Sequence, residues 1–303
     1  MADAQDASKG VIEGCERTYR AYADGFNRKD MVQVEQQMTL PYIMQIDGRL
    51  PGMLHSEAEK KAQFDGALAD MIKRGWVVSD FKIVRVWPLS ENHALLMSDI
   101  IRYKADKSTL ETGRFIYSMR RVDADWRITG VTDVQPGRLG PTDQAWTYPA
   151  TGKPATVDPH LMIHEIETAY NAYGNAFNVH DMATVVKYIA APYIQTIGGN
   201  PPGMAHTAED VKKQFDGSLE YMTKRGWDRS DANIVRIWPL GDNHAFLLAD
   251  VIRYRTDKSI LETGRYLYWV RLAGQSWQLT GVTDVAPPLV GPGDFPRNFP
   301  KAS

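Results

Sequence analysis

The sequence has little that would place the protein outside the cytoplasm. It contains one cysteine, Cys15, among 303 residues, and a single thiol excludes an intramolecular disulfide and fits a reducing compartment. No apolar run approaches the ~20 residues that a membrane-spanning helix needs. The opening MADAQDASKG lacks the basic and apolar regions of a secretory signal. These absences predict a soluble, cytoplasmic protein.

Several common binding signatures are also missing. The formal net charge is −2 and the basic residues do not cluster, so we expect neither nucleic acid nor a membrane surface as partner. The chain has no Gly-rich phosphate loop, no G-x-S-x-G nucleophile elbow and no His/Cys spacing typical of a metal site. We therefore expect no metal ion and no cofactor.

What the chain does contain is a long internal repeat. Residues 92–134 read NHALLMSDIIRYKADKSTLETGRFIYSMRRVDADWRITGVTDV, and residues 243–285 read NHAFLLADVIRYRTDKSILETGRYLYWVRLAGQSWQLTGVTDV. The offset of 151 residues (243 − 92) extends back to Cys15, which the copy replaces with Ile166. Self-similarity at one long spacing indicates a duplicated domain and not a solenoid. The replacement marks the lone thiol as a helix-core residue and not a nucleophile.

The composition suits two domains of ordinary size. A 303-residue chain with 43% hydrophobic and 24% charged residues can build two globular cores. Pro, Gly and Thr interrupt the pattern between the copies and again at the C-terminus. We predict a first domain at 1–138, a linker at 139–159, and a second domain at 160–303 that ends in a Pro-rich surface tail.

Each copy begins with helices. Apolar residues at three- and four-residue steps predict a helix over 11–26. Asp30 with Gln33 predicts an N-cap and capping box for a short second helix that reaches Met38 and stops at Pro41.

A strand and a third helix follow. Residues 42–46 read as a strand closed by Asp47-Gly48, and Ser56 with Glu59 predicts a capping box for the third helix. Gly66 inside this helix is unfavourable by roughly 1 kcal/mol relative to Ala. Because the copy keeps this glycine, we expect another group to pack close to it.

The remainder of each copy is a sheet. After Trp76 the apolar period changes to two, which predicts strands at 81–89, 94–104, 110–122 and 126–134. The fold class predicted is α+β, with helices packed on one face of a curved antiparallel sheet.

At this point the sequence resembles a known superfamily. AYADGFNRKDMVQVEQQMTLPYIMQIDG and its copy AYGNAFNVHDMATVVKYIAAPYIQTIGG resemble the opening of the NTF2-like (SnoaL-like, ketosteroid isomerase-like) superfamily. The ending also resembles it: an Arg-Tyr strand, a Gly-Arg strand and Trp-Arg-Ile precede the last strand. The resemblance covers both copies nearly end to end. It implies two tandem cone-shaped domains that form an intrachain pseudo-dimer, with a homo-oligomer of the pseudo-dimer as a further expectation.

The resemblance does not choose a function. The superfamily includes ketosteroid isomerases, polyketide cyclases, scytalone dehydratases, limonene epoxide hydrolases, lyases of lignin-derived aromatics, and non-catalytic binding or assembly domains. In ketosteroid isomerases a first-helix tyrosine lies eight residues before the Asp that opens the next helix, and it donates a hydrogen bond to the enolate. Tyr22 and Asp30 have that spacing, as do Tyr173 and Asp181. The alternative is that Tyr22 continues the apolar stripe. The family's catalytic Asp is not matched, since Gln45 stands in that region.

Asp99 and its copy Asp250 lie in a strand that is otherwise mostly apolar. A carboxylate buried there has a raised pKa and suits a general base, whereas the alternative is a structural Asp–Arg pair. The cationic partners on the adjacent strand are Arg114 or Arg120, and in the copy Arg265 or Arg271. Alternation places Asp99 and Arg102 on opposite faces.

Histidines and aromatic residues supply further candidates. His55 and His206 precede the third helix at the predicted rim, where they are proton shuttles or exposed loop residues; His93 and His244 follow Asn and read as turn residues. Glu111 with Tyr117 is either an acid–base pair or a solvated glutamate near a turn. The residues proposed to bind a substrate are Tyr42, Trp76, Phe64 and Tyr117, with their copies Tyr193, Trp227, Phe215 and Tyr268.

Three functions remain open. The first is a cofactor-independent lyase, isomerase or dehydratase acting on a small apolar molecule, aromatic or polycyclic, with Asp99/Asp250 as base, Tyr22/Tyr173 as donor and Arg114/Arg265 as charge partner. Replacing both aspartates by Asn is then expected to abolish activity and to leave the melting temperature nearly intact. The second is a non-catalytic small-molecule-binding or assembly module. The third is an epoxide hydrolase, which needs Asp99, Arg114 and Asp133 in one cavity.

Overall fold

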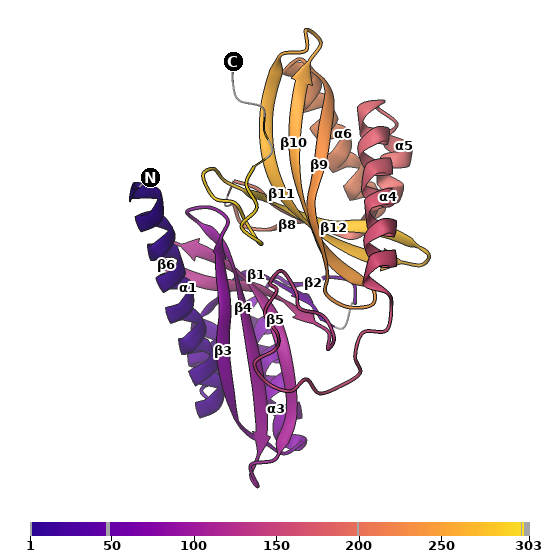
Figure 1. The fold of residues 1–303 in the computed structure, drawn as a ribbon. Helices are drawn as coiled ribbons and strands as arrows, with labels where there is room; N and C mark the ends of the chain where they lie inside the picture. The colour runs from indigo at the N-terminus through magenta and orange to yellow at the C-terminus, as the bar shows by residue number, and fades with distance from the viewer. Residues whose placement is uncertain (1, 47–48, 199, 298, 300–303) are drawn as a thin grey trace. The chain divides into compact units, whose positions relative to one another are not determined.

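The chain forms two compact units. The computed structural model describes residues 2–46, 49–198, 200–297 and 299 (Figure 1). The units are Met1–Ala155, unit 1, and Thr156–Ser303, unit 2. Each is an α+β domain in which helices pack on a curved six-stranded sheet. The turn expected at Asp47-Gly48 lies outside the described residues.

Unit 1 begins with the long helix α1 (Ala2–Arg28). Its buried side chains include Cys15, Tyr19 and Tyr22, at the three- and four-residue steps that place residues on one face. The helix ends where Lys29 takes a left-handed backbone conformation, φ 58°, a common way to terminate a helix. One face of α1 therefore presents two phenols to the sheet.

The short helix α2 (Met31–Gln36) is capped by Asp30, as predicted, because the Asp30 carboxylate accepts a hydrogen bond from the Gln33 backbone N–H at 3.0 Å. The Gln33 side chain donates to the carbonyl oxygen of Ala21 at 2.7 Å, where the sequence predicted a capping box. The cap is confirmed. The box does not form because Gln33 ties α2 back to α1.

The third helix, α3 (Glu57–Lys73), has the complete capping box that its sequence predicts. The Glu59 N–H donates to the Ser56 hydroxyl at 3.2 Å, and the Ser56 N–H donates to the Glu59 carboxylate at 3.1 Å. Gly66 lies in this helix with nothing within 4 Å of where a Cβ would stand. The close packing expected at Gly66 is therefore absent.

The sheet of unit 1 has the order β2-β1-β6-β5-β4-β3. Its strands are β1 (Met38–Gln45), β2 (Gly52–Leu54), β3 (Trp76–Pro88), β4 (His93–Lys104), β5 (Thr109–Val122) and β6 (Asp125–Val134). All neighbours are antiparallel except β1 and β6, which are parallel. The antiparallel meander predicted for the last four strands is confirmed, and the parallel pairing of β1 with β6 makes the sheet mixed.

Two strands begin earlier than the sequence pattern predicts. β1 begins at Met38 and contains Pro41, at which the sequence predicted the end of the second helix. A proline is tolerated because the β1–β6 register breaks between Met38 and Ile43, and β2 pairs with β1 only from Tyr42 onward. β3 begins at Trp76, and its two register shifts against β4 disturb the period-two pattern.

Both faces of the unit 1 sheet are covered. Helices α1 and α3 pack on the inner face (Figure 1), and residues 139–147 pack on the outer face. In unit 1, Arg114 donates hydrogen bonds to the carbonyl oxygens of Leu139, Gln144 and Ala145 at 2.8, 2.9 and 3.0 Å. In unit 2, Arg265 donates to those of Val290, Phe295 and Pro296 at 2.7, 2.5 and 2.8 Å.

We call residues 139–147 and 290–296 the outer segments. They lie within the stretches expected as linker and tail, yet the same offset of 151 residues relates their bonded carbonyls. Each outer segment is therefore an integral part of its own repeat.

Unit 2 repeats the architecture with sheet order β8-β7-β12-β11-β10-β9. Its elements are α4 (Pro159–Asn178), α5 (Met182–Val185), η1 (Val186–Tyr188), β7 (Ile189–Thr196), β8 (Gly203–Ala205), α6 (Ala208–Lys224), β9 (Trp227–Pro239), β10 (His244–Arg255), β11 (Ile260–Ala273) and β12 (Ser276–Val285). Thr207 and Asp210 form the predicted capping box of α6. No helix in the described part of the chain has the length and apolar character to cross a membrane.

The burial of Cys15 gives a first testable prediction. Its side chain is 0% exposed, and desolvation, aided by the charge of Glu16, raises the pKa of the thiol. Because the thiolate is the reactive form, native protein should not react with Ellman's reagent at pH 8, and denatured protein should release one thionitrobenzoate per chain. Cys15→Ile, which installs the residue of the copy, is the blank. Fast reaction of the native protein would show that α1 is not held as described.

Candidate functional site

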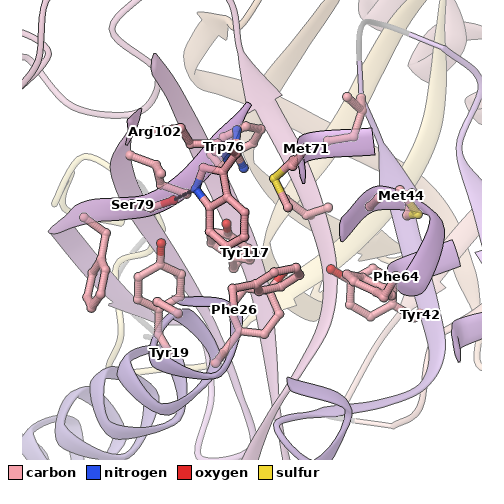
Figure 2. A pocket seen from close by; sticks show the side chains of 18 residues that line it. Tyr19, Phe26, Tyr42, Met44, Phe64, Met71, Trp76, Ser79, Arg102 and Tyr117 are labelled. Atoms are coloured by element: carbon pink, nitrogen blue, oxygen red, sulfur yellow. Dashed lines mark hydrogen bonds between the residues drawn. The ribbon is translucent and has the colours of Figure 1, made fainter. Parts of the chain in front are cut away.

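A cavity of about 170 Å³ lies between the inner face of the unit 1 sheet and helices α1 and α3 (Figure 2). Its lining is mainly aromatic and aliphatic, and comes from all the larger elements of the unit. The lining residues are Tyr19, Tyr22, Ala23, Phe26, Tyr42, Met44, Ile46, Phe64, Ala67, Met71, Trp76, Ser79, Phe81, Ile100, Arg102, Phe115, Tyr117 and Val131.

Local periodicity explains how these side chains converge. Tyr19, Tyr22 and Phe26 recur at three- and four-residue steps on α1, so they share one helix face. Phe115 and Tyr117 are two residues apart on β5 and therefore point to the same side of the sheet. The same alternation brings Ile100 and Arg102 of β4 to the cavity.

Phenol groups are the main polar feature of the cavity wall. Tyr22, Tyr42 and Tyr117 lie on α1, β1 and β5, and Tyr22 and Tyr117 have ring centroids 6.0 Å apart. Burial raises the pKa of Tyr117 to about 12, and burial raises the pKa of Tyr22 and Tyr42 well above the ordinary value. These phenols therefore remain protonated hydrogen-bond donors at neutral pH.

The hydroxyl of Tyr42 has no hydrogen-bond partner among the described residues. The side chain is fully buried, and its hydroxyl is directed into the cavity (Figure 2). A buried donor left unsatisfied is unfavourable by about 1–3 kcal/mol. A molecule in the cavity that offers an acceptor to Tyr42 would recover that energy.

Arg102 is the one charged residue among the described residues that line the cavity. Its Nη1 donates to Glu111 at 2.6 Å, and Glu111 also accepts a hydrogen bond from Arg74. Partial burial opposes ionisation of Glu111, but the hydrogen bond from Arg74 and the charge of Arg102 outweigh it and lower the pKa. Glu111 is thus held as a carboxylate between two guanidinium groups. The sequence offered Tyr117 as its partner, but its hydrogen bonds come from Arg74 and Arg102.

Asp99 and Arg114 lie on the outer face of the sheet and do not line the cavity. Arg114 donates to the Asp99 carboxylate from Nε at 2.6 Å and from Nη2 at 2.9 Å, and the Thr147 N–H donates to it at 2.7 Å. Asp250 and Arg265 form the same pair at 2.6 and 2.8 Å. The aspartates expected as bases are therefore fully engaged away from the cavity.

The pKa of Asp99 is lowered, whereas the sequence predicted a raised pKa. Burial alone would raise it, but the guanidinium of Arg114 and the amide of Thr147 stabilise the charged form more strongly, so the pKa is lowered. A carboxylate of this kind is a poor proton acceptor. The alternative considered from the sequence, a structural Asp–Arg pair, describes the arrangement of these two residues, and Arg114 is the partner in place of Arg120.

The histidines do not contribute to the cavity wall. His55 and His206 are exposed before α3 and α6, and His55 is not among the residues that line the cavity. His93 and His244, expected in turns, are the buried first residues of β4 and β10. Burial, with a smaller effect of the Arg120 charge, lowers the pKa of His93 to about 4, so this ring is neutral at physiological pH.

The structure brings five of the proposed site residues of unit 1 to the cavity and leaves three outside it. Tyr22, Tyr42, Phe64, Trp76 and Tyr117 line it, whereas Asp99, Arg114 and His55 do not. Arg102, Tyr19 and Phe115 line it and were not proposed. The sequence contained a signal for Arg102, because alternation along the strand placed it on the face of the sheet opposite to Asp99, and this is the face that lines the cavity.

In unit 2 the copies of these aromatic residues are buried or partly buried around the inner core. They are Tyr173, Tyr193, Phe215, Trp227 and Tyr268. Two polar replacements change the surroundings. Gln195 replaces Met44 and accepts a hydrogen bond from Gln214 at 2.7 Å, and Tyr266 replaces Phe115 and accepts one from Arg253 at 2.9 Å. The two units therefore differ in how their inner polar groups are satisfied.

Comparisons with known proteins match one repeat at a time. A family model described as NTF2-like protein (DUF6841) matches residues 13–136 and again residues 164–287. An NTF2-like protein of unknown function from Shewanella oneidensis is 14% identical with a TM-score of 0.35, over 41% of this chain and 98% of that chain. A ketosteroid isomerase-like protein from Erwinia carotovora atroseptica is 17% identical with a TM-score of 0.32, over 41% and 96%. A protein of unknown function with a cystatin-like fold from Nostoc punctiforme is 14% identical with a TM-score of 0.35, over 43% and 94%. No curated protein matches the chain.

Proposed function

The chain belongs to the NTF2-like family DUF6841, whose domain it contains twice, and on this basis we propose that unit 1 binds a small aromatic molecule in the cavity between α1, α3 and the sheet. The observation that carries the proposal is the cavity itself, about 170 Å³ with a mainly apolar lining. A cavity of roughly 150 Å³ with an apolar lining accommodates benzene. The size favours a single substituted ring over the polycyclic molecules considered from the sequence.

Binding without turnover is the function that the polar groups support best. No Asp or Glu is among the described residues that line the cavity. Glu111, which is bonded to the lining residue Arg102 and also to Arg74, has a lowered pKa, which makes it a weak base. The wall thus offers hydrogen-bond donors to a ligand but lacks the carboxylate that base-driven chemistry would use.

A second function, isomerisation, elimination or dehydration, is favoured by one specific observation. Tyr22 lines the cavity and stays protonated because burial raises its pKa, and a neutral phenol in a dry site stabilises a developing oxyanion. In this mechanism Tyr22 and Tyr117 would donate to an enolate oxygen, and water or the substrate itself would accept the proton. Epoxide hydrolysis is not proposed, since it requires Arg114 in the cavity.

The test is calorimetric titration with toluene, 4-methylphenol and benzoate. Ala67 of α3 lines the cavity, so Ala67→Phe should fill it and weaken binding by about tenfold or more. Ser218 is the copy of Ala67, and Ser218→Phe is the matched control that should leave the affinity unchanged. Absence of binding to the wild type, or binding unaffected by Ala67→Phe, would contradict the proposal.

Chromatography of the ligand after prolonged incubation separates the two functions. Recovery of unchanged ligand supports binding alone. Conversion that is lost in Tyr22→Phe, while affinity for an unreactive analogue persists, would establish the catalytic function in its place.

A further inference from the structure

One arginine that both units retain has a hydroxyl partner in unit 2 that it lacks in unit 1. Arg102 and Arg253 occupy equivalent positions, and each donates from Nη1 to an equivalent glutamate, Glu111 at 2.6 Å and Glu262 at 2.7 Å. Arg253 has an additional partner, since the same Nη1 donates to the Tyr266 hydroxyl at 2.9 Å.

The residue that corresponds to Tyr266 in unit 1 is Phe115, which has no hydroxyl and lines the cavity. In the described part of unit 1, Arg102 therefore has Glu111 as its hydrogen-bond partner and nothing in place of the phenol. A guanidinium carries five N–H donors, so Arg102, which lines the cavity, has donors beyond the one bonded to Glu111.

The rings of Phe115 and Tyr266 are held in matching orientations. Phe115 lies 6.4 Å from Tyr117 with an interplanar angle of 52°, and Tyr266 lies 6.3 Å from Tyr268 at 49°. Both rings also pack directly over a glycine, where an added Cβ would meet Phe115 Cε2 at 2.4 Å or Tyr266 Cε2 at 2.6 Å. The Tyr266 hydroxyl therefore occupies a position beside Arg253 in unit 2, and Phe115 places no atom at the corresponding position beside Arg102 in unit 1.

We infer that the molecule bound in unit 1 is an aromatic ring that carries an oxygen acceptor, and that this oxygen takes the hydrogen bond from Arg102 that Tyr266 takes from Arg253. The inference rests on the proposed function and adds the ligand's polar group. A phenolic hydroxyl and an aromatic carboxylate share this chemistry. Tyr42, whose buried hydroxyl has no partner in the described residues, supplies a second donor from another wall of the same cavity.

Phe115→Tyr tests the inference, because it supplies to Arg102 the internal acceptor that unit 2 already has. A hydrogen bond to a charged group strengthens binding by roughly ten- to a hundredfold. Wild-type protein should therefore bind 4-methylphenol or benzoate about tenfold or more tightly than toluene. Phe115→Tyr should remove most of that preference. Tyr266→Phe, the reverse exchange in unit 2, is the matched control and should not alter the unit 1 binding constants.

Arg102→Met provides a second route to the same answer. It should also abolish the preference for the oxygen-bearing ligands while toluene still binds. The larger loss, for 4-methylphenol or for benzoate, identifies the oxygen as phenolic or carboxylate. Equal affinity of the wild type for all three ligands, or an unchanged preference in both variants, would overturn the inference and leave the proposed function standing. Failure of the wild type to bind any of the three would instead overturn the proposed function.

Discussion

Asp99→Asn should lower the free energy of unfolding of unit 1 by roughly 3–5 kcal/mol, the range measured when one partner of a buried ion pair is removed. The Arg114 side chain is 0% exposed and that of Asp99 is 1% exposed, so water cannot replace the lost carboxylate charge. Asparagine keeps the size of the side chain but leaves the guanidinium uncompensated. The structure therefore predicts a lower melting temperature for this substitution, where the sequence predicted a nearly intact one.

The measurement is urea unfolding followed by the reactivity of Cys15, which lies in unit 1 and is the only thiol in the chain. Asp125→Asn is the control, because Asp125 forms an ion pair with Arg127 in which its own side chain is 64% exposed. An exposed ion pair contributes little to the free energy of unfolding, so this variant should have the same unfolding midpoint as the wild type. An unfolding midpoint unchanged in Asp99→Asn would show that the outer segment and its ion pair are not held as described.

The same ion pair predicts a pH dependence with a definite sign. Because the pKa of Asp99 is lowered in the folded protein, its ionised form favours the folded state. The stability it contributes is complete above the unfolded pKa of about 4. It is lost as the pH falls through the lower folded pKa. The difference in unfolding free energy between wild type and Asp99→Asn should therefore be constant from pH 5 to 8 and shrink at more acidic pH. A difference that grows on acidification would contradict the assignment.

Much of the fold could be predicted from local sequence. The Ser56–Glu59 capping box and the alternation that separates Asp99 from Arg102 depend only on residues close together in the chain, and the repeat offset follows from comparing the sequence with itself. Whether Asp99 pairs with Arg114 or Arg120 depends on strand register, and the structure aligns Asp99 with Arg114. No local pattern carries that information, since bulges shift the register of these strands.

The outer segments and the cavity were harder to predict for a different physical reason. Residues 139–147 have no apolar periodicity, and they are fixed mainly by their backbone carbonyls, which Arg114 bonds from a distant strand. The cavity exists because aromatic residues of α1, β1, α3 and β5 meet without filling the space beside Ala23 and Ala67. A gap of this kind is a property of tertiary packing.

The comparison of the two units also explains why duplication alone could not identify the site. Residues that both copies keep include the Asp–Arg pair, which anchors an outer segment, as well as Tyr22 and Tyr117, which line the cavity. The substitution of Phe115 by Tyr266 is more informative, because it changes the hydrogen bonding of an arginine that both units retain. A difference between the copies beside a residue that both retain therefore shows where the hydrogen bonding of the two units differs.

The second large effect is expected at Gly130, in the Thr-Gly-Val-Thr-Asp-Val ending of the repeat. A Cβ at this position would lie 2.6 Å from the backbone oxygen of Ile43 and 3.0 Å from its Cβ. The contact is with the backbone of β1, which pairs with β6 at this point, so it cannot be relieved by a side-chain rotation. Gly130→Ala should therefore lower the free energy of unfolding by about 1–3 kcal/mol, the usual range for overpacking.

The displacement caused by Gly130→Ala should also weaken ligand binding, because β1 carries Tyr42 and Met44 into the cavity. Gly281→Ala in unit 2 makes the corresponding clash with Ile194, at 2.8 Å, and should reduce stability without changing the affinity of unit 1.

Gly66→Ala is expected to change the free energy of unfolding in the opposite direction. The site is helical and open, so Ala should stabilise α3 by roughly 0.5–1 kcal/mol. Denaturant unfolding and calorimetric titration of the three variants separate these effects. A stability of Gly130→Ala equal to that of the wild type would show that β1 does not approach β6 as closely as described.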